Sequence, residues 1–148
     1  MTVRIDHVEK INGTRFMGYV IKAHGDMIRA NEAAAEYLNI NWDDQGFFAV
    51  EEKTGAIVGM ITFGKEVPNY QQGLWIKLGF VTAGYRGRGV YRALWDRLVV
   101  FAQNKGVLTI DGTTHSSNVK MRAVAAKLGR IEHAIQLEFK VPQKQSIG

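Results

Sequence analysis

A turn rich in glycine and arginine, GYRGRGVYR, lies at residues 84–92 and runs directly into an apolar helical pattern. Its three arginines supply positive charge, and Gly87 and Gly89 let a bound group approach the backbone without a Cβ in the way. The first turn of a helix adds free amide groups and the positive end of the helix dipole, which together attract phosphate. This combination predicts that the turn binds an anion.

Three phosphate-binding patterns compete for this turn. A Walker loop needs G-x-x-x-x-G-K followed by Ser or Thr, and the stretch has neither that spacing nor that ending, so the loop is excluded. The dinucleotide pattern G-x-G-x-x-G is matched at its first two glycines, but Arg92 stands at the third. What remains is a strand, a turn of the form R-x-x-G-x and a helix whose amides face a pyrophosphate.

Positive charge is concentrated around the same turn. Residues 86–130 hold nine of the 19 basic and two of the 14 acidic residues, so this segment carries +7 and the rest of the chain −2. Such a field attracts nucleic acid, membrane headgroups or a phosphorylated small molecule, and a solvated basic face is the alternative without a ligand. No aromatic stacking platform is interleaved with the arginines, which argues against nucleic acid as a partner.

Hydrophobic periodicity predicts the elements that would position this turn. They are a strand at residues 3–7, two helices between Thr14 and Leu38 divided at Gly25–Asp26, a hairpin at 46–64, a central strand at 74–81, a helix at about 90–104, a short strand at 107–111, a helix at about 116–129, and a long strand at 130–141. The order is β-α-α-β-β-β-α-β-α-β. It predicts an α/β fold with one sheet, mixed and mostly antiparallel, flanked by helices.

Composition limits the class of protein. With 148 residues, 46% of them hydrophobic and 22% charged, the chain is expected to form a single globular domain over residues 1–148. Apolar runs fall short of the roughly 20 residues of a membrane span, and the first residues do not resemble a signal peptide, so we expect a cytoplasmic protein with no membrane partner. The absence of cysteine excludes a thiolate nucleophile and Cys-based zinc sites, and no metal site is expected.

Three stretches resemble the motifs of one enzyme family. FVTAGYRGRGVYRAL resembles the acetyl-CoA-binding motif of the GCN5-related N-acetyltransferase (GNAT) superfamily, in which Gln or Arg, two residues, Gly, one residue and a small residue open a helix. Arg86 and Gly89 match that motif. FFAVEEKTGAIVGMITFG is similar to the family's second hairpin, and NVKMRAVAAKLG resembles its segment with Asn and Gly eleven positions apart, here Asn118 and Gly129. The resemblance covers about residues 46–130 and implies an acetyltransferase-type fold.

The resemblance implies an N-acetyltransferase that moves an acetyl group from acetyl-CoA to an amine by direct attack. A small-molecule or peptide amine would bind between the N-terminal helices and the strand at residues 74–81. That strand splays from its neighbour in the family, so its backbone pairs with the pantetheine arm while the turn holds the pyrophosphate. The cofactor-binding residues implied are Phe80, Val81, Arg86, Gly87, Arg88, Gly89, Val90, Tyr91 and Asn118.

The residues that would transfer protons are less well defined. The family often places a tyrosine seven residues after the asparagine to protonate the departing thiolate, and this chain has Ala125 there. His115 could supply that proton, while Asp111 or Glu52 could serve as the base. Tyr91 stands where the motif has a small residue. These departures support an alternative, an acyl-CoA-binding module of the same fold without turnover, with a nucleic-acid-binding protein as a weaker one.

Acidic residues before the hairpin are candidates to attract a cationic amine, although solvated helix surface is the favoured interpretation. They are Glu32, Glu36, Asp43 and Asp44.

The end of the chain also departs from the family, which commonly closes its sheet with two strands. Only 19 residues follow Gly129. A single strand at residues 130–141 would therefore replace both strands, pair with a second copy of the chain, or leave the sheet open. An exposed edge of this kind favours a homodimer.

Overall fold

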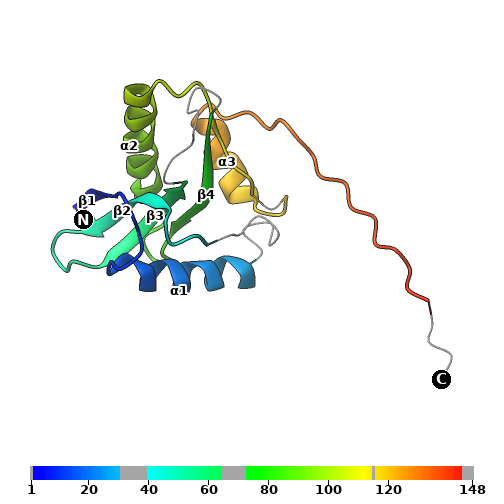
Figure 1. The fold of residues 1–148 in the computed structure, drawn as a ribbon, viewed down its shortest axis with the longest axis horizontal. Coiled ribbons are helices and arrows are strands. Elements are labelled where there is room, and N and C mark those ends of the chain that lie inside the picture. Colours follow the sequence, from blue (N-terminus) through cyan, green and yellow to red (C-terminus); the bar gives the residue numbers. More distant parts are fainter. Residues whose placement is uncertain (1, 31–39, 65–72, 115, 145–148) are drawn as a thin grey trace. The chain divides into compact units, whose positions relative to one another are not determined.

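The computed structural model describes residues 2–30, 40–64, 73–114 and 116–144. The chain divides into two compact units, residues 1–118 and 119–148. The first unit holds the sheet and two helices, and the second holds one helix followed by a segment without regular structure (Figure 1). The single domain expected over residues 1–148 therefore stays a prediction.

The sheet of the first unit has five strands that follow one another in chain order. Its antiparallel part consists of β1 (Val3–Val8), β2 (Gln45–Glu51), β3 (Ile57–Phe63) and β4 (Leu74–Val81). The short strand β5 (Ile110–Asp111) pairs with β4 in parallel. The predicted α/β fold with a mixed, mostly antiparallel sheet is confirmed.

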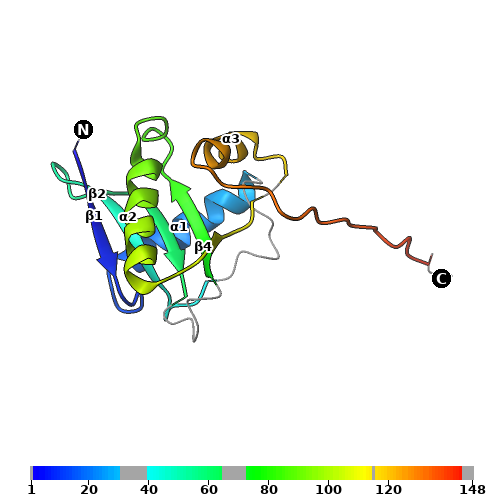
Figure 2. The same cartoon turned by 90° about the horizontal axis from the view of Figure 1, so that it is seen from above.

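Helices α1 (Phe16–Arg29) and α2 (Val90–Lys105) cover opposite faces of this sheet (Figures 1 and 2). On one face, α1 buries side chains at spacings of four, three and four residues against Phe48, Met60, Leu78 and Phe80. On the other face, Phe101 of α2 lies 5.2 Å from Phe63, ring centre to ring centre. Burial of such aromatic and aliphatic groups, at about 1.5–3 kcal/mol each, is what fixes both helices on the sheet.

Helix α1 does not break where the sequence suggested. The prediction of two helices divided at Gly25–Asp26 is wrong, because α1 runs without interruption from Phe16 to Arg29. The apolar stripe continues through the glycine to Met27, and its burial exceeds the roughly 1 kcal/mol that a glycine costs inside a helix. Of the second helix expected before Leu38, the part after residue 30 lies outside the described residues.

The strand expected from Arg130 to Val141 is also wrong. Residues 130–144 contain neither strand nor helix, and the alternating apolar side chains Ile131, Ile135, Leu137 and Phe139 are 76–90% exposed. Alternation gives a segment the two faces of a strand, but a strand forms only beside a neighbour that supplies hydrogen bonds. Within the described residues, no strand pairs with this segment.

The second unit begins with α3 (Val119–Lys127). Gly129, two residues after the helix, has a left-handed conformation with φ of 82°. The Arg122 guanidinium donates two hydrogen bonds to the Glu132 carboxylate, at 2.7 and 3.1 Å. This pair lowers the pKa of Glu132 and joins the helix to the segment that follows it.

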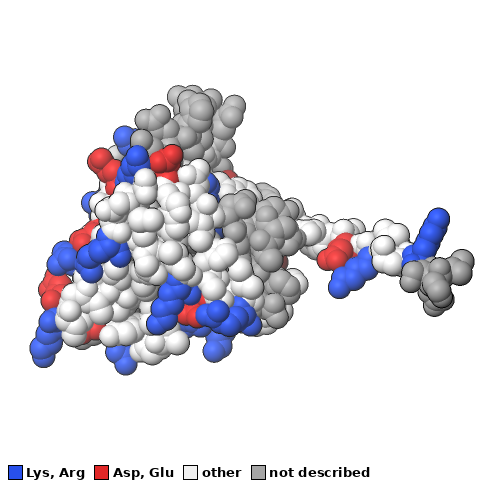
Figure 3. Space-filling model, turned by 60° about the horizontal axis from the view of Figure 1, so that its bottom comes forward, with Lys and Arg blue, Asp and Glu red and all other residues white. Residues whose placement is uncertain are grey.

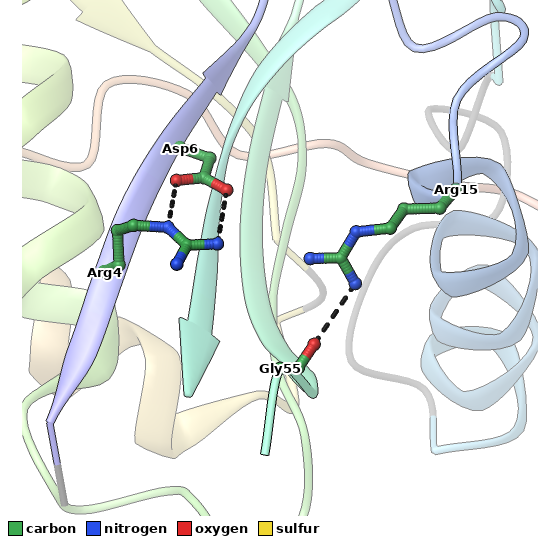
Figure 4. A network of polar contacts seen from close by, with 4 residues as sticks. All are labelled: Arg4, Asp6, Arg15 and Gly55. Carbon is green, nitrogen blue, oxygen red and sulfur yellow. Dashed lines mark hydrogen bonds and ion pairs between the residues drawn. The ribbon is translucent and has the colours of Figure 1, made fainter. Parts of the chain in front are cut away.

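Charged side chains mark the outer edge of the sheet at β1. Arg4 and Asp6 form an exposed ion pair, 2.7 Å from Nε to Oδ1, and Arg15 donates to the carbonyl of Gly55 at 3.1 Å in the turn between β2 and β3 (Figure 4). Charge on an edge strand opposes pairing with another chain.

Among the helices of the described ranges, none is long and apolar enough to cross a membrane.

We expect Gly25→Ala to stabilise the protein by about 0.5–1 kcal/mol, because alanine favours helix and a Cβ here would meet only the flexible end of Arg29, 3.2 Å away. Urea unfolding measures the change. Gly18→Ala, at a helical position with open space, is the matched control and should give a similar gain. Destabilisation by Gly25→Ala alone would contradict the continuous helix.

Candidate active site

The candidate site begins where β4 and β5 part. The two strands pair only at Leu74 with Ile110 and at Trp75 with Asp111. From Ile76 to Val81, the side of β4 turned away from β3 has no strand beside it among the described residues. The splayed strand implied by the sequence resemblance is therefore present as an open edge.

A bulge lies at the point of separation. Leu78 of β4 pairs with Thr62 of β3, but the next pair is Ile76 with Phe63, so Lys77 is an extra residue without a partner. Bulges bend a strand and end its pairing, and they are frequent beside functional sites.

Backbone groups of β4 face its two edges in alternation. The N–H of Thr82 donates to the carbonyl of Val58 at 2.9 Å, so residue 82 faces the β3 side. In an antiparallel ladder the direction alternates from residue to residue, which turns Phe80 to β3 as well and turns Gly79 and Val81 to the open edge. Of the two strand residues that the sequence suggested, Val81 has the orientation that pairing with a ligand requires.

The glycine-rich turn connects this edge to α2. Gly87 and Gly89 have φ values of 74° and 80°, which residues with a Cβ rarely adopt. Gly89 is also the residue before the helix, and it provides no side chain to cap the first amides. The hydroxyl of Tyr85 donates to the Glu51 carboxylate at 2.7 Å, which fixes the turn to β2. The start of α2 thus presents backbone amides and a positive dipole end beside β4.

The three arginines of this stretch have different environments. Arg86 donates from Nε to the carbonyl of Val81 at 2.8 Å, and its guanidinium lies 5.2 Å from the centre of the Phe80 ring. Arg88 is exposed, with its guanidinium 5.6 Å from the ring centre of Tyr85. Arg92 pairs with Asp96 one helical turn later, at 3.0 Å. Arg86 thus closes the turn, while Arg88 carries its charge at the surface beside the amides.

The ring of Tyr91 fits over a glycine of β4. A Cβ built on Gly79 would lie 3.4 Å from Cε2 and 3.6 Å from the hydroxyl oxygen of Tyr91. The strand therefore has room beside the ring for a single methyl group but not for a larger side chain. The phenol lies beside the part of β4 whose backbone faces the open edge.

A second half-buried phenol, that of Tyr19, lies where α1 meets the end of β4. The hydroxyl of Tyr19 is 2.9 Å from Oγ1 of Thr82, and burial raises the pKa of Tyr19 to about 12, so the group is neutral at physiological pH. The two residues line a cavity of about 110 Å³. That volume is below the roughly 300 Å³ at which ligand pockets begin.

The candidate catalytic residues are not all brought together. Asp111 belongs to the last β4–β5 pair and accepts a hydrogen bond from Oγ1 of Thr109 at 2.9 Å. Glu52 lies in the turn before β3, whereas Asp111 lies near the end of β3. The seven residues of β3 therefore separate the two carboxylates by about 20 Å, at 3.3 Å per residue. Asn118 donates to Oγ1 of Thr114 at 3.2 Å. His115 lies outside the described residues, as do Glu32 and Glu36.

Asp44 is not the solvated residue that the sequence suggested. Only 4% of it is exposed, and Lys77 donates from Nζ to its Oδ1 at 2.9 Å. Burial raises the pKa of the Asp44 carboxyl, and the hydrogen bond from Lys77 opposes that shift. Asp43 remains exposed and lies 3.6 Å from Nζ of Lys10. Sequence reasoning missed Lys77, although one charged residue in an otherwise apolar central strand was a visible signal.

Charge on the surface is mixed. On the face drawn in Figure 3, Lys and Arg side chains form several separate groups with Asp and Glu among them, and no continuous basic surface appears. Among the described residues, no group of three His, Asp or Glu side chains is arranged to hold a metal ion.

Comparison with protein families gives one match, which spans most of the chain. Residues 19–129 match the sequence profile of the acetyltransferase (GNAT) family. A comparison with curated protein sequences found no significant match.

Several solved structures resemble the chain in fold. One is an aminoglycoside acetyltransferase from an uncultured soil metagenomic sample, with 19% identity, coverage of 96% of this chain and 100% of that one, and a TM-score of 0.69. A second is AAC(6′)-Iy in complex with a bisubstrate analogue, CoA-S-monomethyl-acetylneamine, with 15% identity, coverage of 97% of this chain and 100% of that one, and a TM-score of 0.59. A third is a ribosomal-protein-alanine N-acetyltransferase from Brucella melitensis biovar Abortus, with 16% identity, coverage of 97% of this chain and 100% of that one, and a TM-score of 0.61.

We expect Gly79→Val to lower the free energy of unfolding by about 1–3 kcal/mol, because the new side chain would displace the Tyr91 ring. Urea unfolding measures the loss. The double variant Gly79→Val/Tyr91→Gly should recover much of it, since the valine then occupies the space of the ring. Strictly additive losses would show that the two positions do not interact.

Proposed function

This chain belongs to the acetyltransferase (GNAT) family and is an N-acetyltransferase that acts on an amine, and we propose that acetyl-CoA, bound between β4 and the start of α2, donates the acetyl group. The observation that carries the proposal is that two features lie next to each other. The open edge of β4 leads into a turn with left-handed glycines, and this turn ends at the start of α2, which no side chain caps. The edge suits a ligand with amide groups, and the helix start suits its pyrophosphate.

In this arrangement the pyrophosphate contacts the amides of residues 86–91, with Arg88 as an additional cation. The pantetheine arm then extends along β4 towards the bulge and pairs with the backbone of Gly79 and Val81. The path from Val81 to Lys77 spans four residues, about 13 Å at 3.3 Å per residue. Asn118, which closes the first compact unit, is a further candidate to contact the arm.

The reaction would take place near the point where β4 and β5 separate. The amine nitrogen forms a bond to the thioester carbonyl carbon, the carbon–sulfur bond breaks, and CoA leaves as a thiolate. A backbone N–H group at the bulge end of the open edge would stabilise the oxyanion of the tetrahedral intermediate. Asp111 is the candidate to accept the amine proton, and His115 or water would protonate the thiolate.

The acceptor is proposed to be a small-molecule amine, with a peptide amine as the second class. One similar structure is that of an aminoglycoside acetyltransferase in complex with sisomicin, and another acetylates alanine of ribosomal proteins by its name, so the fold serves both classes. A panel of polyamine, aminoglycoside and peptide acceptors in a thiol-release assay would separate them.

Calorimetric titration with acetyl-CoA, followed by detection of free CoA with amine acceptors, tests the function. We expect Arg88→Ala to weaken acetyl-CoA binding by about 1.5–3 kcal/mol, the range for a hydrogen bond to a charged group. Arg92→Ala is the matched control, because this arginine already pairs with Asp96, and it should have a smaller effect. Absence of binding at millimolar acetyl-CoA would refute the proposal, and binding without thiol release would favour the acyl-CoA-binding module.

We also propose that the chain forms a homodimer through residues 130–141. Their apolar side chains are exposed in alternation, and β5 is the last strand of the sheet, whereas the edge at β1 carries the Arg4–Asp6 ion pair. An exposed alternating segment and an open edge are the two halves of a strand pairing.

Light scattering at micromolar concentration should give the mass of a dimer, and Leu137→Asp/Phe139→Asp should shift it to the monomer by placing charges on the apolar face. A monomeric mass for the unaltered chain would rule this assembly out. The cytoplasmic location expected from the sequence stays a prediction, which cell fractionation would test.

A further inference from the structure

We propose that the ion pair between the buried Asp44 and the partly exposed Lys77 holds the bulge in β4 and thereby keeps the outer edge of that strand open for the acetyl-CoA arm. The inference rests on the proposed function, since it concerns the same edge. Both residues are positioning residues, because they act through the backbone of β4 and are not argued to touch the ligand.

The position of Lys77 links the bulge to the open edge. It is the extra residue of β4, without a partner in β3, and it follows the last β4–β5 pair by only two positions. If β4 had no extra residue here, its backbone would continue in register, and pairing with β5 could extend beyond Trp75. A ligand arm and a neighbouring strand compete for the same backbone groups, so a closed edge would exclude the arm.

The reach of the Lys77 side chain shows how the bulge is held. Asp44 directly precedes β2, and β3 lies between β2 and β4 in the sheet. The side chain of Lys77 must therefore extend across β3 to bring Nζ within 2.9 Å of Asp44 Oδ1. An extended lysine loses much of its rotamer freedom, and its charge is compensated only while the backbone of residue 77 keeps this place. The pair thus ties the bulge to the start of β2.

The burial of Asp44 strengthens this tie, while the Lys77 side chain is 28% exposed. The buried polar residues of the described chain are Asp44, Gln45 and Thr62, at 4%, 5% and 2% exposure. They lie together, because Gln45 pairs with Phe63 and Thr62 pairs with Leu78, both next to the bulge. The Thr62 hydroxyl has no hydrogen-bond partner among the described residues. A buried charge without its partner is strongly unfavourable, and an arrangement that separates the two is therefore disfavoured.

The test separates this role from ordinary stabilisation. Lys77→Met leaves the buried Asp44 carboxylate without its cation, and Asp44→Asn leaves the partly exposed Lys77 without its anion. The double variant removes both charges and should unfold at a urea concentration close to that of the unaltered protein. Calorimetry then compares acetyl-CoA with 3′-phospho-ADP, its nucleotide half. We expect the double variant to bind acetyl-CoA about tenfold more weakly, with unchanged affinity for the nucleotide, because only the arm uses the edge. Lys77→Arg keeps the ion pair and should retain acetyl-CoA affinity.

Amide hydrogen exchange provides a readout without ligand. Residues 76–81 should become better protected in the double variant if β4 and β5 pair further. Arg4→Met/Asp6→Asn, which removes an exposed ion pair from β1, is the control and should change neither measurement. Unchanged acetyl-CoA affinity in the double variant, or equal weakening of both ligands, would overturn the inference while leaving the proposed function standing. If the unaltered protein binds no acetyl-CoA, both fall.

Discussion

The candidate site depends on where hydrogen bonding between β4 and β5 ends. Parallel pairing stops after two residue pairs, and the following residues of β4 keep backbone groups that no strand uses within the described chain. Everything else at the site is placed by this event: the bulge at Lys77 marks it, Asp111 lies at it, and the turn at residues 84–89 begins where the open edge ends. An unsatisfied strand edge is normally a liability, and here it supplies the recognition surface.

The two helices make such an edge tolerable, because they hold β4 from both faces. Phe80 packs towards α1, whereas Gly79 faces the ring of Tyr91 at the start of α2. The strand therefore does not need β5 over its full length to stay in place. The turn is fastened independently, by Arg86 to the carbonyl of Val81 and by Tyr85 to Glu51. A rigid frame of this kind lowers the entropic cost of binding a long flexible ligand.

Much of this arrangement could be predicted from the sequence, because it follows from local patterns. The hairpin, the central strand and α2 appear where alternation and helical spacing placed them. The errors have one common cause, which is that a local sequence pattern contains no information on the residues that pack or pair beside it in the fold. Gly25 lies inside α1 because the buried stripe continues on both sides of it, and residues 130–141 alternate perfectly without a described strand to pair with. The Asp44–Lys77 pair joins residues 33 positions apart, so neither residue alone revealed it.

The contact between Gly79 and Tyr91 has a consequence for how related sequences diverge. A single methyl group at position 79 would be in ordinary contact with a ring at position 91, whereas a branched or larger strand residue needs a small helix residue. A lineage that enlarged position 79 before reducing position 91 would pass through a less stable intermediate. Relatives with a branched or larger side chain at position 79 should therefore carry a small residue at position 91.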